Sequence, residues 1–272
     1  MIIKTTNGPV RGGTKEGVHY FLGIPYAAAP DGAKRFKAPQ APEKWSNELD
    51  ATSFGDVCLQ AQMPGIFGDI GTPSNAPGPN SLNLNVWTPE PGATKLPVLM
   101  WIHGGAFYAG SGIDEVYDGT AFARDGVVCV TINYRLGAQG FAHLADQFSE
   151  LSDSGNCGLL DQIAALEWIR DNIAAFGGDP WNVTIAGESA GGMSVGTLLA
   201  TPKAKGLFHR AIPQSGAAHN GVSAETGSLI ASHLLAEVNV RPGDLDALLK
   251  VSPENLLAAQ VRLNDELAAT RN

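Results

Sequence analysis

Cysteine is scarce in this sequence. Its 272 residues include three cysteines, Cys58, Cys129 and Cys157, at scattered positions. So few cysteines exclude a disulfide framework and a zinc site built on paired cysteines. Cys129 lies in the apolar run 127–132, so we expect it to pack in the core.

Long apolar runs and positive charge are also in short supply. No apolar run reaches the ~18 residues that a bilayer crossing needs. The first eight residues lack the basic segment and apolar stretch of a secretory signal. Lys and Arg number 18 against 27 Asp and Glu, so the chain offers no electrostatic footprint for nucleic acid or an anionic membrane. We therefore expect a cytoplasmic, globular protein without a nucleic-acid or membrane partner.

Hydrophobic residues make up 44% of the chain, which permits a sizeable core, and their pattern changes along the sequence. Residues 1–50 predict a small antiparallel edge of short strands. Residues 82–220 alternate strands with helices, which is typical of an α/β core. Residues 221–272 predict only short helices. The predicted elements are strands at 2–5, 10–11, 18–22, 82–87, 98–102, 127–132, 183–185 and 211–214, and helices at 156–176, 193–200, 228–235, 245–250 and 253–263. These segments indicate one domain over 1–272.

Two stretches before the core lack regular patterns. Residues 25–50 contain four prolines and predict irregular chain that packs through Phe36 and Trp45. Residues 60–81 are rich in Gly and Pro and predict a long loop. Such a loop is either a lid over a binding site or a merely mobile surface segment, and the sequence leaves both open.

The stretch 182–192 organises the rest of the chain. Its β-branched residues predict a strand, and Gly187, Ser189 and Gly191 form the pattern G-x-S-x-G before a helix. A serine at the apex of such a turn has strained backbone angles, and only glycine fits two residues to either side. The helix that follows directs its first N–H groups at any negative charge beside the serine. A nucleophile elbow is therefore predicted, although the pattern alone also fits a Gly-rich loop.

A second motif decides between these interpretations. His103-Gly-Gly follows directly on the apolar strand 98–102. Glycines there let the N–H groups of Gly104 and Gly105 approach a substrate oxygen, and the N–H of Ala190 would complete an oxyanion hole. We expect His103 to shape this loop rather than to act as the base. Candidate walls of an acyl or alcohol pocket are Phe107, Tyr108, Met193 and Ser215.

With both motifs present, residues 8–220 resemble the type B carboxylesterases, the group of bacterial p-nitrobenzyl esterases and cholinesterases. The resemblance rests on motifs in the family's order. They are Phe21-Leu-Gly-Ile-Pro-Tyr-Ala27, Arg35-Phe36, Leu84-Asn-Val-Trp87, His103-Gly-Gly-Ala-Phe107, Asn133-Tyr-Arg-Leu-Gly137, the stretch 155–162, Phe176-Gly-Gly-Asp-Pro180, Gly187-Glu-Ser-Ala-Gly-Gly192 and Gln214-Ser-Gly216. It implies an α/β-hydrolase fold with a mostly parallel central sheet, ester hydrolysis through an acyl-enzyme, and no cofactor. It also implies an ion pair between Arg135 and Asp161.

Three departures from the family pattern matter. Residues 79–81 (Pro-Asn-Ser) replace the family's Glu-Asp-Cys run, so Cys58 loses its disulfide partner and Arg35 its acidic partner. The unpaired Cys58 agrees with a reducing compartment. The triad acid and histidine have no counterpart, because His209, His219 and His233 lie in segments unlike that of the family's base. We expect His209 to pack after the elbow helix, and His219 and His233 to be solvated.

These features predict the N-terminal part of a carboxylesterase, with the C-terminal part of the fold missing. Ser189 would be the nucleophile of an acyl-enzyme mechanism, yet no residue here would take its proton, so little turnover is expected from this chain alone. Its expected partners are a small-molecule ester and, as a candidate, the complementary C-terminal polypeptide. Two alternatives are a non-catalytic esterase-like binding protein and a hydrolase acting on amides or lactones.

Overall fold

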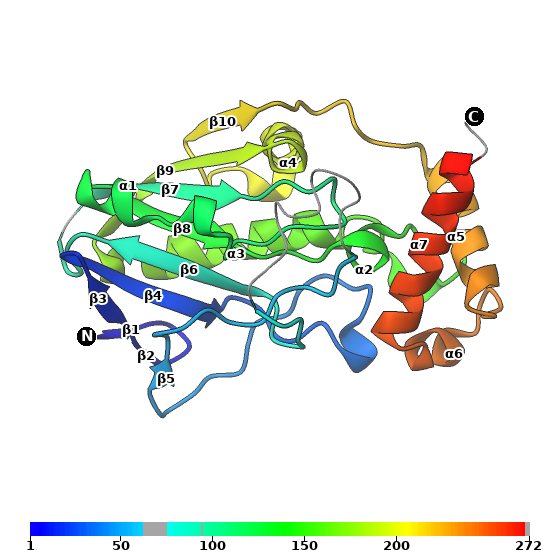
Figure 1. The fold of residues 1–272 in the computed structure, drawn as a ribbon, viewed down its shortest axis with the longest axis horizontal. Helices are drawn as coiled ribbons and strands as arrows, with labels where there is room; N and C mark the ends of the chain where they lie inside the picture. Colours follow the sequence, from blue (N-terminus) through cyan, green and yellow to red (C-terminus); the bar gives the residue numbers. More distant parts are fainter. Residues whose placement is uncertain (62–74, 94, 270–272) are drawn as a thin grey trace.

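A seven-stranded mixed sheet forms the centre of the described part of the chain (Figure 1). The structure is a computed structural model that describes residues 1–61, 75–93 and 95–269. Its strands are β1 (Ile2–Lys4), β2 (Pro9–Arg11), β3 (Gly13–Lys15), β4 (Val18–Pro25), β5 (Leu49–Asp50), β6 (Asn83–Thr88), β7 (Leu96–Ile102), β8 (Val128–Ile132), β9 (Gly178–Glu188) and β10 (Arg210–Gln214). Its α-helices are α1 (Thr120–Arg124), α2 (Gly137–Phe141), α3 (Cys157–Asn172), α4 (Ala190–Ala200), α5 (Ala224–Glu237), α6 (Leu245–Lys250) and α7 (Pro253–Ala269).

The order of strands in the main sheet is β10-β9-β7-β8-β6-β4-β3. Strands β10, β9, β7 and β8 pair in parallel, whereas β6, β4 and β3 add antiparallel pairs on the other side. Along this strand order, the connection from β7 to β8 runs in one direction, and the connection from β8 to β9 runs back past β7 in the opposite direction. Because such crossovers are right-handed, helices α1 and α3 lie on opposite faces of the sheet. The α/β class with a largely parallel centre and antiparallel N-terminal strands is therefore confirmed.

The first fifty residues depart from the single antiparallel edge that the sequence predicts. Strands β1 and β2 pair antiparallel, but β5 joins β2 in parallel, and the three form a separate small sheet. Strands β3 and β4 belong instead to the main sheet. The chain changes sheets at Gly12, where a Cβ would lie 2.2 Å from the carbonyl oxygen of Tyr20. A residue without a side chain is thus required there.

Apolar packing follows the sequence closely. Every residue of β8 is buried, including Cys129, as the apolar run predicts. Phe36 is buried, and Trp45 is partly buried against the main core. A second apolar cluster joins helices α5 and α7 to Phe36, Leu144 and Phe148, at the end of the molecule opposite the N-terminus (Figure 1).

The helix predicted over 156–176 ends earlier than expected. The stretch 156–176 forms α3 only as far as Asn172 and continues as a 3-10 turn over Ile173–Phe176. Asn156 occupies the N-cap position, but its side chain makes no capping hydrogen bond. Gly177 ends the segment with φ of 90°, a left-handed conformation that suits glycine.

Candidate active site

Ser189 stands alone between β9 and α4, at the carboxyl edge of the parallel strands. Its φ of 54° and ψ of −120° place it in a region that residues with a side chain seldom adopt. Its N–H donates to the carbonyl oxygen of Gln214 over 2.9 Å, and its own carbonyl accepts from Met193. This geometry is that of the strained strand-to-helix turn that the G-x-S-x-G pattern predicts.

The flanking glycines are required by their contacts with β7. A Cβ on Gly191 would lie 2.0 Å from the carbonyl oxygen of Ile102, and one on Gly187 would lie 2.7 Å from the same atom. Real Cβ atoms do not approach backbone oxygens so closely. Glycine is therefore needed on both sides of Ser189 because the elbow packs against the last residue of the neighbouring strand.

The loop after β7 lies beside the elbow. Ile102 pairs with Gly187 in the parallel register, so the chain leaves β7 level with the turn. A Cβ on Gly104 would lie 3.3 Å from the Cβ of Ser189. No described residue accepts a hydrogen bond from the N–H groups of Gly104 or Gly105. The N–H of Ala190, the first residue of α4, also has no acceptor within the helix.

His103 lies under this loop and shapes it, as the sequence predicts. Its Nδ1 is 2.7 Å from the carbonyl oxygen of Gly104, and since that oxygen only accepts, Nδ1 carries the proton. Its ring stacks on Tyr134, with centroids 4.4 Å apart. Burial lowers the pKa of His103 to about 4, so the ring is neutral at pH 7.

Two side chains near the elbow were not singled out from the sequence. Glu188 precedes the serine, and its Oε2 would lie 3.2 Å from a Cβ on Gly104. The hydroxyl of Tyr134 donates to the carbonyl oxygen of His103 over 2.9 Å. Their motifs, Gly187-Glu-Ser and Asn133-Tyr-Arg, stood in the sequence, but their contacts depend on the pairing of separate strands.

The buried ion pair that the resemblance implies is present. Arg135 donates from Nε and Nη2 to the two carboxylate oxygens of Asp161 over 2.8 and 2.6 Å. The exposed fractions of the two side chains are 4% and 0%. Burial alone would lower the pKa of Arg135, but the charge and hydrogen bonds of Asp161 outweigh it and raise that pKa. The pair holds the loop after β8 against α3.

All three cysteines are buried and unpaired, as the loss of the family's partner for Cys58 predicts. The thiol of Cys58 donates to the carbonyl oxygen of Tyr134 over 3.1 Å. Burial raises the pKa of Cys58 to about 12, so the thiol stays protonated. It acts as a small core side chain rather than as a nucleophile.

No described residue forms a hydrogen bond with the hydroxyl of Ser189. His209, which we expect to pack, is exposed, and its Nδ1 accepts from the N–H of Val183. His219 and His233 are exposed, as expected. His143 faces Asp146 across 3.4 Å. No triad is thus assembled from the described residues.

Two of the four predicted pocket residues line different cavities among the described residues. Phe107 lines a cavity of about 520 Å³ together with Phe141 and Thr197. Tyr108 lines a separate small hollow that faces α7. Met193 packs beneath Gly216, and neither it nor Ser215 lines these two spaces. Most of the 60–81 loop lies outside the described residues.

The model of the carboxylesterase family matches residues 1–266. This chain belongs to the carboxylesterase family. It is 48% identical over 264 residues to the para-nitrobenzyl esterase of Bacillus subtilis, covering 97% of this chain and 53% of that protein. It is 45% identical over 231 residues to a medium-chain fatty acyl-CoA hydrolase precursor of Anas platyrhynchos, covering 79% of this chain and 40% of that protein.

Solved structures of carboxylesterases also resemble this chain. A carboxylesterase of Geobacillus stearothermophilus superposes with a TM-score of 0.90 at 48% identity, covering 96% of this carboxylesterase-family chain and 53% of that one. A thermophilic PNB esterase gives a TM-score of 0.91 at 45% identity, covering 100% of this chain and 55% of that one. The chain therefore spans about half the length of the relatives it matches. Among the helices that the structure describes, none has the length and apolar character that a membrane crossing needs.

Proposed function

We propose that this chain carries the nucleophile and the oxyanion hole of a serine carboxylesterase. The observation that carries the proposal is the strained backbone of Ser189, with φ of 54°, beside the N–H groups of Gly104 and Gly105, which have no acceptor among the described residues. Backbone N–H donors beside a serine nucleophile can stabilise the oxyanion that forms on the carbonyl oxygen of a substrate when the hydroxyl attacks. Membership of the carboxylesterase family supports a carboxylic ester as the substrate.

The reaction would run through an acyl-enzyme. The hydroxyl oxygen of Ser189 attacks the ester carbonyl carbon while its proton passes to a general base. The N–H groups of Gly104, Gly105 and Ala190 stabilise the oxyanion, and its collapse breaks the bond to the alkoxide, which leaves with the proton. Water then attacks the acyl group by the same steps and releases the carboxylate and Ser189.

The base and its acidic partner would come from polypeptide outside these residues. Support comes from the described histidines, because none hydrogen-bonds to the hydroxyl of Ser189 and His103 is held under the loop by Gly104. Without a base that hydroxyl remains protonated and reacts poorly. We therefore propose that residues 1–272 alone hydrolyse esters little or not at all.

Strand β10 is the surface on which the complementary polypeptide would dock. It pairs with β9 on one side and is the last strand of the described sheet on the other (Figure 1). Ile212 on this strand is 46% exposed and Leu199 on the adjoining helix α4 is 60% exposed. An unpaired apolar edge invites another strand, and a strand added there would extend the sheet.

A chimera tests this proposal. Residues 1–266, the part that the family model matches, would be joined to the remainder of the Bacillus subtilis para-nitrobenzyl esterase. We expect the chimera to hydrolyse p-nitrophenyl butyrate and to be labelled by a fluorophosphonate at Ser189, whereas the chain alone does neither at an appreciable rate.

Ser189→Ala in the chimera is the matched control, because it removes only the hydroxyl. It should abolish labelling and reduce turnover by a factor of about 10⁴ or more. A folded chimera that resists the fluorophosphonate would favour an esterase-like binding protein instead. Hydrolysis of butyramides or lactones in preference to butyrate esters would change the substrate class.

Candidate walls of the substrate pocket remain Phe107, Tyr108, Met193 and Ser215. Phe107 has the best support, because it follows the oxyanion loop and lines the 520 Å³ cavity. We further propose the cytoplasm as the compartment, since three buried, unpaired cysteines suit a reducing environment.

A further inference from the structure

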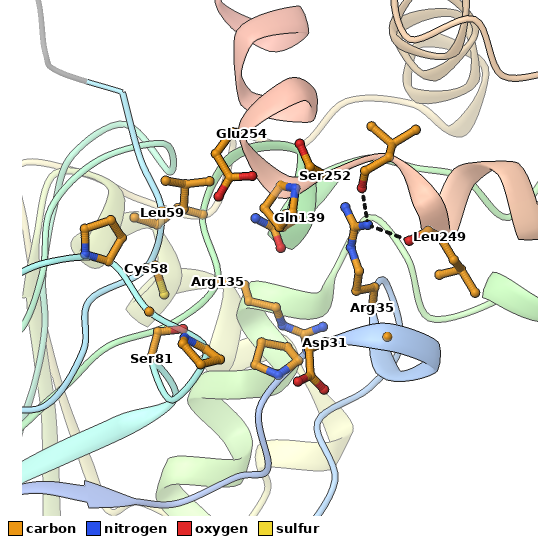
Figure 2. A pocket seen from close by; sticks show the side chains of 18 of the residues that line it. Asp31, Arg35, Cys58, Leu59, Ser81, Arg135, Gln139, Leu249, Ser252 and Glu254 are labelled. Atoms are coloured by element: carbon orange, nitrogen blue, oxygen red, sulfur yellow. Dashed lines mark hydrogen bonds between the residues drawn. The ribbon is translucent and has the colours of Figure 1, made fainter.

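Arg35 is a buried cation with an unusual set of partners. The residue is 5% exposed. Its Nη1 donates to the carbonyl oxygens of Leu249 and Val251, over 3.2 and 2.5 Å, at the end of α6 (Figure 2). Its guanidinium carbon lies 5.0 Å from the ring centroid of Phe36. These contacts hold the guanidinium in place without neutralising its charge.

Two donors of Arg35 stay unused. Both Nε and Nη2 are buried, and no described residue accepts a hydrogen bond from either. Buried donors without an acceptor are costly, and more so on a charged group. Burial lowers the pKa of Arg35, and the charge of Glu254 opposes this effect. The neighbouring Arg135 differs, because its Nε and Nη2 are both bound by Asp161.

A cavity of about 480 Å³ lies against Arg35 and is distinct from the cavity at Phe107. Much of its wall is apolar, including Pro30, Leu59 and Leu136. Its charged lining also includes Lys250. Figure 2 shows the carboxylates of Asp31 and Glu254, which line it too. Gln139 and Ser252 stand on the same side as Arg35 and add polar groups (Figure 2).

We propose that this cavity binds a small monocarboxylate with an apolar tail, whose two oxygens accept hydrogen bonds from Nε and Nη2 of Arg35. The Nε–Nη2 edge of a guanidinium presents two parallel donors that match a planar carboxylate. The apolar walls receive the tail. A doubly charged phosphate fits less well, because Asp31 and Glu254 also line the cavity and Arg35 is the one buried cation among its described lining residues that forms no ion pair.

Hexanoate and its neutral isostere hexanamide provide the test. Isothermal titration of the 272-residue chain should detect hexanoate binding at least tenfold tighter than hexanamide binding. Arg35→Met keeps most of the aliphatic part of the side chain and removes the guanidinium. It should therefore abolish the preference for hexanoate over hexanamide. Circular dichroism establishes that this variant is folded.

Glu254→Gln provides a second test, which leaves the side chain of Arg35 in place. It removes a competing negative charge from an exposed position at the start of α7, and we expect hexanoate to bind several-fold more tightly. Glu266→Gln, exposed on the same helix and not part of the cavity wall, should leave the affinity unchanged.

Three results would overturn the proposal. They are equal affinity for hexanoate and hexanamide, hexanoate binding that survives Arg35→Met, and inorganic phosphate that displaces hexanoate at a lower concentration than benzoate does. If Arg35→Met does not fold, an affinity unaltered by Glu254→Gln would count against the proposal in the same way. None of these measurements depends on Ser189 chemistry, so failure of the esterase proposal would be seen separately.

Discussion

The N–H of Ser189 donates a hydrogen bond to the carbonyl oxygen of Gln214 over 2.9 Å. Gln214 is the last residue of β10, so the turn that carries the nucleophile is fastened to the edge of the sheet. On its other side, the turn packs against the end of β7 through Gly191. The strained geometry of Ser189 is thus held from both neighbouring strands, as strain at a functional site requires.

Relief of this strain should be measurable. We expect Ser189→Gly to raise the free energy of unfolding by about 1 kcal/mol, because glycine adopts φ near 54° without the Cβ penalty. Ser189→Ala keeps the Cβ and should leave stability nearly unchanged. Urea titrations of the three proteins give the comparison. Equal stability of the Gly and Ala variants would show that the turn stores no strain.

Gly191 should tolerate no side chain. Gly191→Ala places a methyl group 2.0 Å from the carbonyl oxygen of Ile102 and should lower the free energy of unfolding by about 3 kcal/mol. Gly221 is the matched control, since a Cβ there meets nothing within 4 Å. A Gly191→Ala protein as stable to urea as Gly221→Ala would contradict the packing argument.

The ion pair of Arg135 should be costly to break. Asp161→Asn leaves the buried guanidinium without its counter-charge, so we expect a loss of about 3–5 kcal/mol in the free energy of unfolding. Glu237→Gln, which breaks the more exposed pair with Arg262, should cost at most about 1 kcal/mol. Similar losses in the two variants would mean that burial does not determine how much an ion pair contributes to the free energy of unfolding.

His103 should make stability depend on pH. Its pKa is lowered to about 4 in the folded chain, so between pH 6.5 and 4 the unfolded chain binds the proton and the folded chain does not. Stability therefore falls as pH drops through this window, by about 3 kcal/mol from this group.

The measurement is the difference between two series of urea titrations. His103→Gln should be less sensitive than the original chain between pH 6.5 and 4, because the titrating ring is gone. His233→Gln, at an exposed position, should retain the original dependence. If the free energy of unfolding falls equally in His103→Gln and in the original chain between pH 6.5 and 4, His103 does not cause the pH dependence.

Local patterns predicted a large part of the fold and of the candidate site. The apolar runs located β7 and β8, and the Gly-Ser-Gly spacing located the elbow between β9 and α4. Predictions based on single residues fared less well. His209 is exposed and Asn156 makes no capping bond, because neither outcome follows from the neighbouring residues along the chain.

By itself the sequence determined the family, the α/β class and the position of Ser189, because these depend on periodicity and on residues adjacent in the chain. Only the tertiary structure decided what surrounds them. The split of the first strands between two sheets and the two donors of Arg35 that have no acceptor among the described residues both arise from contacts between distant segments. Such contacts depend on strand order and helix placement, for which a linear pattern contains no signal.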